Sequence, residues 1–278
     1  MRKILLTVII LVIVGFAVYK GNTTVEMSYY EVESNQLPAS FDGYKIVQIS
    51  DLHDSLHGEN HSYVVNEIKK VTPQAIFITG DFIDSNRYDL EQSLLIVKEL
   101  QDVAPIYYVT GNHEISTNDT DHIKESLREF GVRVLSDEAD VITSRNGETI
   151  AIGGIEDPLA SSLEDDVAIQ QSITQAFDRV SEDIFKVLLS HRPEQFDTYV
   201  ANKIDLTFSG HAHGGQFRIP GFGGLVSPGQ GLFPKLTAGV HEEAGSQLVI
   251  SRGLGNSLMP VRLFNKPEIV TVTLRKKS

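Results

Sequence analysis

The sequence predicts an α/β fold in which the first sheet is largely parallel. From residue 44 onward, apolar runs of strand length alternate with segments of helical period. Polar clusters directly follow several of these runs, as they do at the ligand-binding ends of parallel strands. In addition, 41% of the 278 residues are hydrophobic, which is enough for a sizeable core.

The first half of the chain repeats a strand followed by a helix. Apolar runs at residues 44–50, 75–79 and 106–110 have the length and continuity of buried strands. Between them, apolar residues at helical spacing mark helices within residues 64–71 and 90–97. Because parallel strands need a long crossover connection, this alternation predicts parallel pairing.

The second half is less regular. Helical spacing recurs within residues 123–130 and 169–180, whereas residues 214–234 are rich in Gly and Pro, which predicts loops with tight turns. The expected strands are residues 132–135, 149–155, 185–190, 206–209, 247–251 and 268–274. No internal repeat and no second linker interrupts this part, so we expect one domain over residues 43–278.

The N-terminus is a separate unit. Arg2 and Lys3 precede an apolar run over residues 4–19, which would span about 24 Å as a helix, against roughly 30 Å for a bilayer core. The run suits a transmembrane anchor or the apolar part of a cleaved signal segment within residues 1–20; a buried core helix is the third alternative. The charge bias predicts a single-pass cell-membrane protein with an extracytoplasmic domain, or a secreted one if the segment is cleaved. Residues 21–42, polar and irregular, are expected to be a tether.

The charge and composition restrict the classes of partner and the types of metal ligand that the chain can have. The formal net charge is −13, and no basic stripe offsets it, so nucleic acid is disfavoured as a partner. The chain has no cysteine, which excludes disulfides, thiolate nucleophiles and sulfur metal ligands. Any metal must be held by nitrogen and oxygen.

Five short polar stretches follow predicted strands, and they supply imidazoles, carboxylates and one amide. They are Asp51-Leu-His53, Gly80-Asp81, Gly111-Asn112-His113-Glu114, His191 and Gly210-His211-Ala-His213. The candidate metal ligands among them are Asp51, His53, Asp81, Asn112, His191, His211 and His213. Seven ligands suit two divalent ions if one carboxylate bridges them, and mixed imidazole and carboxylate donors suit Mn, Fe or Zn.

The order of these stretches resembles that of the calcineurin-like metallophosphoesterases, over about residues 45–274. Two further segments, His211-Ala-His-Gly-Gly-Gln-Phe-Arg-Ile-Pro220 and Ser251-Arg-Gly-Leu-Gly-Asn256, resemble membrane-anchored bacterial members of the YkuE/YaeI-like group. The resemblance implies a four-layer αββα sandwich of two mixed sheets flanked by helices. It also implies that one metal is held by Asp51, His53, Asp81 and His213. The other would be held by Asp81, Asn112, His191 and His211, with Asp81 bridging.

Two catalytic residues follow from the same resemblance. His113, next to a ligand, would stabilise or protonate the leaving oxygen. Asp84 matches the second acid of the family's Gly-Asp-x-x-Asp motif and would orient His113, unless it only caps its loop. Protein phosphatases follow this acid with Arg-Gly, but this chain has Ser85-Asn86, so protein phosphatase activity is not expected.

Other residues have open roles. Arg192, Arg218 and Arg252 are alternative substrate contacts, or simply partners of acids. His57 and His61 are expected to be solvated residues of a loop that rims the site. Apolar residues recur within the Gly-rich segment and either cover the core or line a pocket for an apolar substrate tail. They are Phe217, Phe222, Leu225, Leu232 and Phe233.

We therefore expect a metal-dependent phosphoesterase that uses a hydroxide bridging two metals, with Mn first and Zn or Fe as alternatives. Its substrate would be a phosphodiester or pyrophosphate, lipid-linked or from the cell envelope. A phosphomonoesterase is the close alternative, and a non-catalytic scaffold of the same fold is a third; loss of ligands would mark the scaffold. The sequence does not indicate the oligomeric state.

Overall fold

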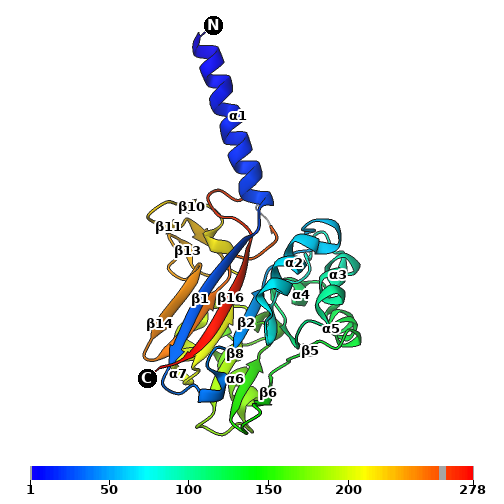
Figure 1. The fold of residues 1–278 in the computed structure, drawn as a ribbon, viewed down its shortest axis with the longest axis vertical. Coiled ribbons are helices and arrows are strands. Elements are labelled where there is room, and N and C mark those ends of the chain that lie inside the picture. The colour runs from blue at the N-terminus through cyan, green and yellow to red at the C-terminus, as the bar shows by residue number, and fades with distance from the viewer. Residues whose placement is uncertain (1, 257–260, 278) are drawn as a thin grey trace.

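The computed structural model describes residues 2–256 and 261–277. Its N-terminal run forms the helix α1 (Arg2–Thr23), which projects away from the rest of the fold (Figure 1). Within the described residues, no helix combines the length and the apolar character needed to cross a membrane, so the expected membrane helix is not confirmed. The last turn of α1 contains Lys20 and Asn22, so the helix is longer than its apolar run.

Two six-stranded mixed sheets form the body of the protein. The first has the order β1-β16-β2-β3-β4-β5, in which β2 to β5 are mutually parallel and β16 is antiparallel to β2. Its strands are β1 (Glu26–Ser34), β2 (Lys45–Ile49), β3 (Ala75–Thr79), β4 (Ile106–Val109), β5 (Arg133–Val134) and β16 (Glu268–Lys276). The predicted parallel pairing is confirmed for this part of the chain.

The second sheet has the order β14-β15-β9-β8-β7-β6. Here β15, β9, β8 and β7 are parallel neighbours, and the two edge strands pair antiparallel. Its strands are β6 (Glu138–Thr143), β7 (Thr149–Gly154), β8 (Phe185–Leu189), β9 (Leu206–Ser209), β14 (Gly239–Glu243) and β15 (Ser246–Ile250). The edge strands β6 and β14 were not predicted, because their outward faces are polar and half-exposed.

Helices cover the outer face of each sheet. The helices are α2 (Ser62–Val71), α3 (Leu90–Leu100), α4 (Asn112–Ser116), α5 (Thr120–Glu129), α6 (Asp165–Phe177) and α7 (Phe196–Ala201). One buried cluster joins α2, α3 and α5 to the first sheet, another joins α6 and α7 to the second, and a third lies between the sheets. Strand β3 shows how one strand serves two of these clusters, because successive side chains of a strand point to opposite faces. Ile76 and Ile78 pack toward the helices. Phe77 packs toward the other sheet, where its ring centroid lies 5.0 Å from that of Phe208. The expected layering is confirmed.

The tether prediction was wrong for part of residues 21–42. Residues 26–34 form β1, which pairs in parallel with β16 along its whole length. Only Val32 of this strand is fully buried, because β1 is an edge strand with a largely solvent-facing surface. Its sequence is therefore about as polar as that of a linker, although its backbone is paired in the sheet.

The Gly-rich segment forms short hairpins, as its composition predicted. They consist of β10 (Arg218–Ile219), β11 (Gly223–Gly224), β12 (Val226–Ser227) and β13 (Gly231–Leu232). A single bridge between Phe217 and Leu263 joins this segment to the chain that follows residue 260.

Candidate metal centre

The predicted ligands gather where the two sheets meet. The parallel strands β2, β3 and β4 end before Asp51, Asp81 and Asn112, and β8 and β9 end before His191 and His211. Below them, buried Gln48 of β2 donates hydrogen bonds to Thr79 Oγ1 and to the carbonyl of Ser209, both at 2.9 Å. This amide ties the carboxyl ends of the two sheets together.

Six of the seven predicted ligands form two groups that share one residue. Asp51, His53, Asp81 and His213 form the first group, and Asp81, His191 and His211 form the second. Within each group, one ligand atom from every residue lies within 4.8 Å of the others, and all these side chains are buried. Asp81 is the shared member, so the geometry suits two neighbouring ions.

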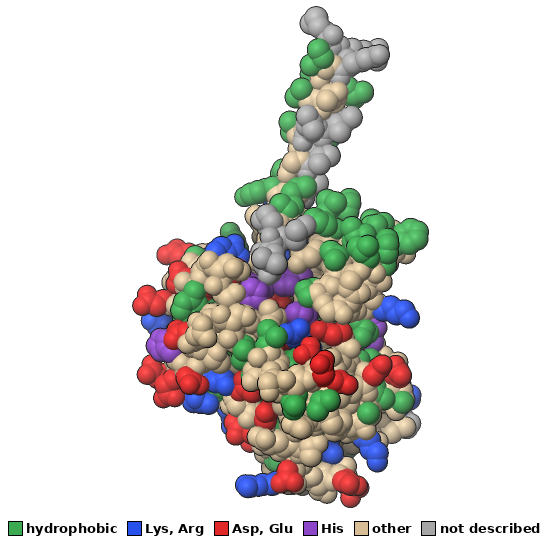
Figure 2. Space-filling view, turned by 180° about the vertical axis from the view of Figure 1, so that it is seen from behind, with side chains coloured by type: hydrophobic (Ala, Val, Ile, Leu, Met, Phe, Trp, Pro, Cys, Tyr) green, Lys and Arg blue, Asp and Glu red, His purple; other side chains and the backbone are tan. Residues whose placement is uncertain are grey.

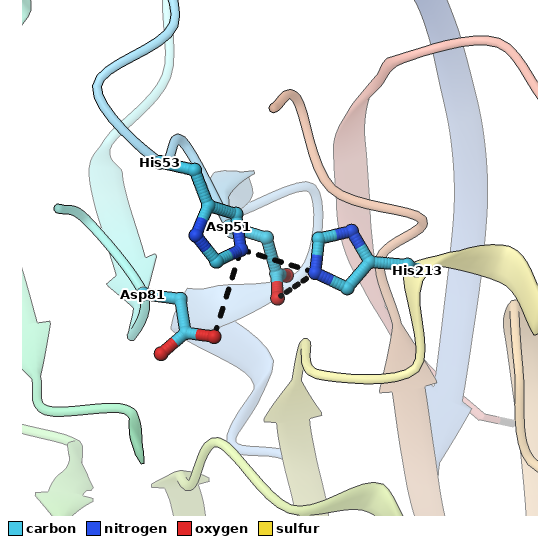
Figure 3. A group of neighbouring side chains, drawn as sticks. All are labelled: Asp51, His53, Asp81 and His213. Atoms are coloured by element: carbon cyan, nitrogen blue, oxygen red, sulfur yellow. Dashed lines mark hydrogen bonds and ion pairs between the residues drawn. The ribbon is translucent and has the colours of Figure 1, made fainter. Parts of the chain in front are cut away.

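The first group surrounds one small volume (Figure 3). Nε2 of His53 lies 3.1 Å from Nε2 of His213 and 3.6 Å from Oδ2 of Asp81. Nε2 of His213 lies 3.4 Å from Oδ1 of Asp51. Nitrogens and oxygens that converge at such distances share a position from which each can reach a single cation.

The second group is oriented by a backbone carbonyl. Nδ1 of His191 lies 2.8 Å from the carbonyl oxygen of Thr79, which can only accept, so Nδ1 carries the proton and donates it. Nε2 is thereby left as the nitrogen that can bind a metal, and it lies 3.2 Å from Oδ2 of Asp81 and 3.2 Å from Nδ1 of His211. An imidazole held by a carbonyl at its far nitrogen is the usual arrangement of a metal-binding histidine.

The backbone at the site is strained. Five predicted ligands have a positive φ between 46° and 62°, a region that residues other than glycine rarely adopt. These are Asp51, His53, Asp81, His211 and His213. Such conformations persist only where the surrounding structure enforces them, and they concentrate at functional sites.

A glycine permits the closest approach between the two sheets. A Cβ at Gly210 would lie 2.0 Å from Oγ of Ser50 and 2.4 Å from Oδ2 of Asp51. Because Gly210 has no side chain, the loop after β9 approaches the loop after β2 closely enough for the N–H of His211 to donate to Oδ1 of Asp51 at 2.9 Å. The absence of a side chain at residue 210 therefore allows the close approach of Asp51 and His211.

Several buried polar atoms in the site have no hydrogen-bond partner among the described residues. Oδ1 of Asn112, Oδ2 of Asp51 and Nδ1 of His53 are in this state. Buried polar atoms are normally paired, and an unpaired one calls for an explanation such as an ion. The orphaned Oδ1 of Asn112 fits the ligand role expected for that residue.

The charges of the site also suit cations. Burial lowers the pKa of His53 to about 3, and it holds the pKa values of His211 and His213 well below their usual range, so these rings are neutral electron-pair donors. Burial opposes ionisation of both Asp81 and His191, yet their mutual attraction prevails: it lowers the pKa of Asp81 and raises that of His191 to about 10. Binding of a cation at Nε2 of His191 would displace the proton that this nitrogen carries in the metal-free protein.

Glu114 organises the loops that carry the shared carboxylate. Its buried carboxyl group accepts hydrogen bonds from the backbone N–H groups of Asp81 at 3.0 Å, Gly111 at 2.6 Å and Ile83 at 3.1 Å. Burial, and then the charge of Asp81, raises the pKa of Glu114 to about 8. No role was assigned to this residue from the sequence, although a Glu at the third position of a helix is a known capping signal.

His113 lies at the edge of the two groups, with its ring centroid 4.5 Å from that of His53. Its Nδ1 accepts a hydrogen bond from the backbone N–H of Ser85 at 3.0 Å. Oδ1 of Asp84 lies farther away, 3.7 Å from the same nitrogen. The Asp84 carboxylate also accepts from Nε of Arg87 at 2.8 Å and from the N–H of Asn86 at 2.9 Å.

The three arginines with open roles are all engaged within the protein. Nε and Nη2 of Arg192 donate to both oxygens of Asp157, at 2.6 and 2.9 Å, and its Nη1 lies 3.3 Å from Nε2 of His211. Arg218 donates to the carbonyl of Gly214, and Arg252 pairs with Glu268. Of the three, only Arg192 has a contact with a predicted ligand. Fully buried Arg262, which the sequence did not single out, lies 3.3 Å from Nδ1 of His213.

The expectation for His57 and His61 was wrong. Both rings are buried, and Nε2 of His61 lies 3.1 Å from the carbonyl of Gln92. The contact with Gln92 of α3 is a long-range one that local polarity does not reveal, while Leu56, Glu59 and Asn60 of the same loop remain exposed.

Comparison with known proteins agrees with this geometry. A family profile described as calcineurin-like phosphoesterase matches residues 44–215. A Bacillus subtilis protein described as the uncharacterized metallophosphoesterase YkuE is 28% identical, over 94% of this chain and 89% of its own. YkoQ of the same organism, with the same description, is 30% identical over 97% and 98% of the two chains. A Bos taurus transmembrane protein with metallophosphoesterase domain is 27% identical, over 88% of this chain and 56% of its own.

Solved structures show more distant likenesses. The NAD nucleotidase of Haemophilus influenzae matches with a TM-score of 0.46 and 18% identity, over 74% of this chain and 44% of its own. A dimetal phosphatase from Danio rerio matches with a TM-score of 0.42 and 12% identity, over 76% and 88% of the two chains. Likenesses of this size carry no information about the substrate.

Proposed function

This chain belongs to the calcineurin-like phosphoesterase family and is a phosphate-ester hydrolase, and on that premise we propose a two-metal reaction at a phosphodiester or pyrophosphate bond. The observation that carries the proposal is the position of Asp81 in both groups of potential ligands. Sites with two ions that share a carboxylate are suited to in-line displacement at phosphorus.

The residues present fit two divalent ions. Asp51, His53, Asp81 and His213 would hold one, and Asp81, Asn112, His191 and His211 would hold the other. The orphaned Oδ1 of Asn112 and the neutral rings of His211 and His213 support this division. When bound, the ions would supply an activated water and positive charge for the phosphoryl oxygens. Nitrogen and oxygen donors of this kind suit Mn, Zn or Fe.

His113 is proposed as the general acid. Because the Ser85 N–H donates to its Nδ1, the neutral ring carries its proton on Nε2, the nitrogen opposite that contact. The neutral ring would hydrogen-bond the oxygen of the departing alcohol or phosphate through Nε2–H, and a ring protonated on both nitrogens would transfer the Nε2 proton to that oxygen and return to the neutral form. Asp84, whose negative charge is close to the ring, would stabilise the protonated form.

The substrate is proposed to be a lipid-linked or cell-envelope phosphodiester or pyrophosphate. The guanidinium groups of Arg218 and Arg252 are already paired within the protein, so neither of the two is free to form the tight clamp on phosphate that a small phosphomonoester needs. An ester with a second, larger group would gain its affinity from contacts beyond the phosphate.

The N-terminal helix is proposed to hold the chain at the cell membrane, with the domain on the extracytoplasmic side. The exposed apolar side chains of α1 support this placement, since Ile4, Leu5 and Phe16 are at least 60% exposed. The name of the Bos taurus relative, a transmembrane protein, points in the same direction.

A substrate panel tests the proposal. The purified protein is loaded with Mn²⁺, Zn²⁺ or Fe²⁺ and given lipid-linked pyrophosphates, nucleotides, bis-p-nitrophenyl phosphate and p-nitrophenyl phosphate. We expect diesters or pyrophosphates to give the higher kcat/KM. A preference for the monoester would replace this proposal with a phosphomonoesterase, and protein that binds no metal and turns over nothing would support a scaffold.

A further inference from the structure

The face beside the base of α1 carries a patch of exposed apolar side chains. We call it the apolar rim, and its residues are Ile219, Phe222, Leu232, Phe233, Leu263 and Phe264. Figure 2 shows it as a hydrophobic area next to the base of the helix, with histidine side chains visible beside it. The exposed fractions reach 86% for Phe222 and 72% for Leu232, so these side chains do not cover the core. Soluble surfaces seldom gather so many large apolar groups without a partner.

The rim is held in place by backbone contacts. The N–H of Arg218 donates to the carbonyl of Leu263 at 2.9 Å, and the N–H of Phe233 donates to the carbonyl of Leu225 at 2.9 Å. Phe233 and Phe264 have φ values of 55° and 52°, which bulky residues rarely adopt. The fold therefore accepts strain at two aromatic residues that are 68% and 67% exposed, which favours a functional reason for their exposure.

The rim is joined to both α1 and the metal centre. Asn22 at the end of α1 exchanges hydrogen bonds with the backbone of Arg262, at 3.0 and 2.7 Å. Asn265, directly after Phe264, donates to the carbonyl of His213 at 2.7 Å. Whatever covers the rim would thus lie against the base of the helix and near the predicted metal ligands.

The charges near the rim favour one kind of occupant. The chain has a formal net charge of −13, yet residues 206–241 contain no Asp or Glu. Lys235 and Lys266, each two positions after a rim residue, are exposed, as is Lys20 on α1. Apolar side chains with exposed lysines nearby in the chain, in a segment that itself has no Asp or Glu, complement a layer of lipids with anionic headgroups.

We propose that the apolar rim rests in the headgroup region of an anionic lipid layer and so places the metal centre at the lipid surface. The rim would be a second contact with the layer, in addition to α1. This proposal rests on the membrane placement proposed for α1 but not on the proposed reaction, since its test requires no turnover.

The chain contains no tryptophan, which allows a direct test. Phe222→Trp is made in the full chain, with Val141→Trp on the edge strand β6 as the control; Val141 is 44% exposed and is tethered by the same α1. Both proteins are incorporated into vesicles of phosphatidylcholine and phosphatidylglycerol whose acyl chains are brominated. We expect roughly twofold quenching of the indole emission in Phe222→Trp, because an interfacial segment is buried about 5–10 Å, and no quenching in Val141→Trp.

Equal quenching in both variants, or none in either, would overturn the proposal. A blue shift of the Phe222→Trp emission that grows with protein concentration and needs no lipid would overturn it in favour of contact with a second copy. If Phe222→Trp fails to fold, as judged by its Tm, Leu232→Trp serves the same purpose. Lys235→Gln combined with Lys266→Gln should weaken quenching only in vesicles that contain phosphatidylglycerol; no effect of that pair would overturn the anionic part.

Discussion

The backbone N–H of Ser85 donates a hydrogen bond to Nδ1 of His113 over 3.0 Å, and this contact determines which nitrogen of the ring carries the proton. A backbone N–H can only donate, so the neutral His113 is protonated on Nε2. The Ser85 hydroxyl lies 3.1 Å from the same Nδ1 and can be lost without removing the backbone donor. Ser85, which replaces the arginine of protein phosphatases, thus takes part in orienting the predicted acid.

His113→Ala tests the role of general acid. We expect a fall in kcat of about 10²- to 10⁴-fold, the usual contribution of proton transfer, with unchanged metal content. The loss should be smaller for bis-p-nitrophenyl phosphate than for a diester of an aliphatic alcohol, because p-nitrophenolate departs without a proton. Steady-state kinetics on the two esters and elemental analysis measure these effects.

Ser85→Ala is the matched control for that experiment, since it keeps the backbone donor and removes only the hydroxyl. Its kcat should stay within a few-fold of wild type. An equal loss of rate on both esters in His113→Ala would contradict proton donation by His113.

Asp81→Asn tests the shared ligand. A neutral amide in place of a carboxylate common to both groups should reduce binding of both ions, so we expect protein with little bound metal. Asp51→Asn is the comparison, because Asp51 belongs to the first group alone and its loss should leave one ion bound. Elemental analysis of the purified variants gives the stoichiometry. Two ions in Asp81→Asn, or full activity, would refute the bridging assignment.

Glu114→Gln tests the support beneath the metal centre. Glutamine offers one acceptor oxygen where the carboxyl group receives three backbone N–H groups, so a buried donor would lose its partner. An unsatisfied buried group costs about 1–3 kcal/mol, and we expect a lower Tm together with weaker metal binding. Glu125→Gln, on the exposed surface of α5, is the control and should leave both unchanged. Wild-type Tm in Glu114→Gln would mean that the loops do not depend on this carboxyl group.

Because His57 is buried, we expect the free energy of unfolding to depend on pH. Burial lowers the pKa of His57 to about 4 from a usual 6.5, so the folded state resists protonation more than the unfolded state does. The resulting stability is present above pH 6.5 and is lost as the pH falls from 6.5 toward 4. At pH 5 the loss attributable to His57 is about 2 kcal/mol.

His57→Gln should therefore lose less stability between pH 7 and pH 5 than the wild type. Urea unfolding of metal-free protein at the two pH values measures the difference, and the other buried histidines contribute equally to both proteins. The same loss in wild type and variant would show that His57 does not titrate differently on folding.

Much of the fold follows from local patterns. The expected strands at residues 75–79 and 206–209 match β3 and β9 at both ends, because a continuous apolar run bounded by polar or glycine residues is a strong strand signal. The edge strands β1, β6 and β14 were missed for the opposite reason. One face of each is open to solvent, so their sequences resemble loops.

In the candidate site, too, some features follow from local sequence and others only from the packing of distant segments. Local sequence was sufficient to select seven side chains by chemical type and by their place after a strand, since both properties are set by a few neighbouring residues. The approach of Asp81 to His191 within 3.2 Å, the three N–H groups on Glu114 and the burial of His57 depend on segments far apart in the chain. Periodicity reports how a residue faces its own element, whereas these contacts arise only when two sheets pack with their carboxyl ends together.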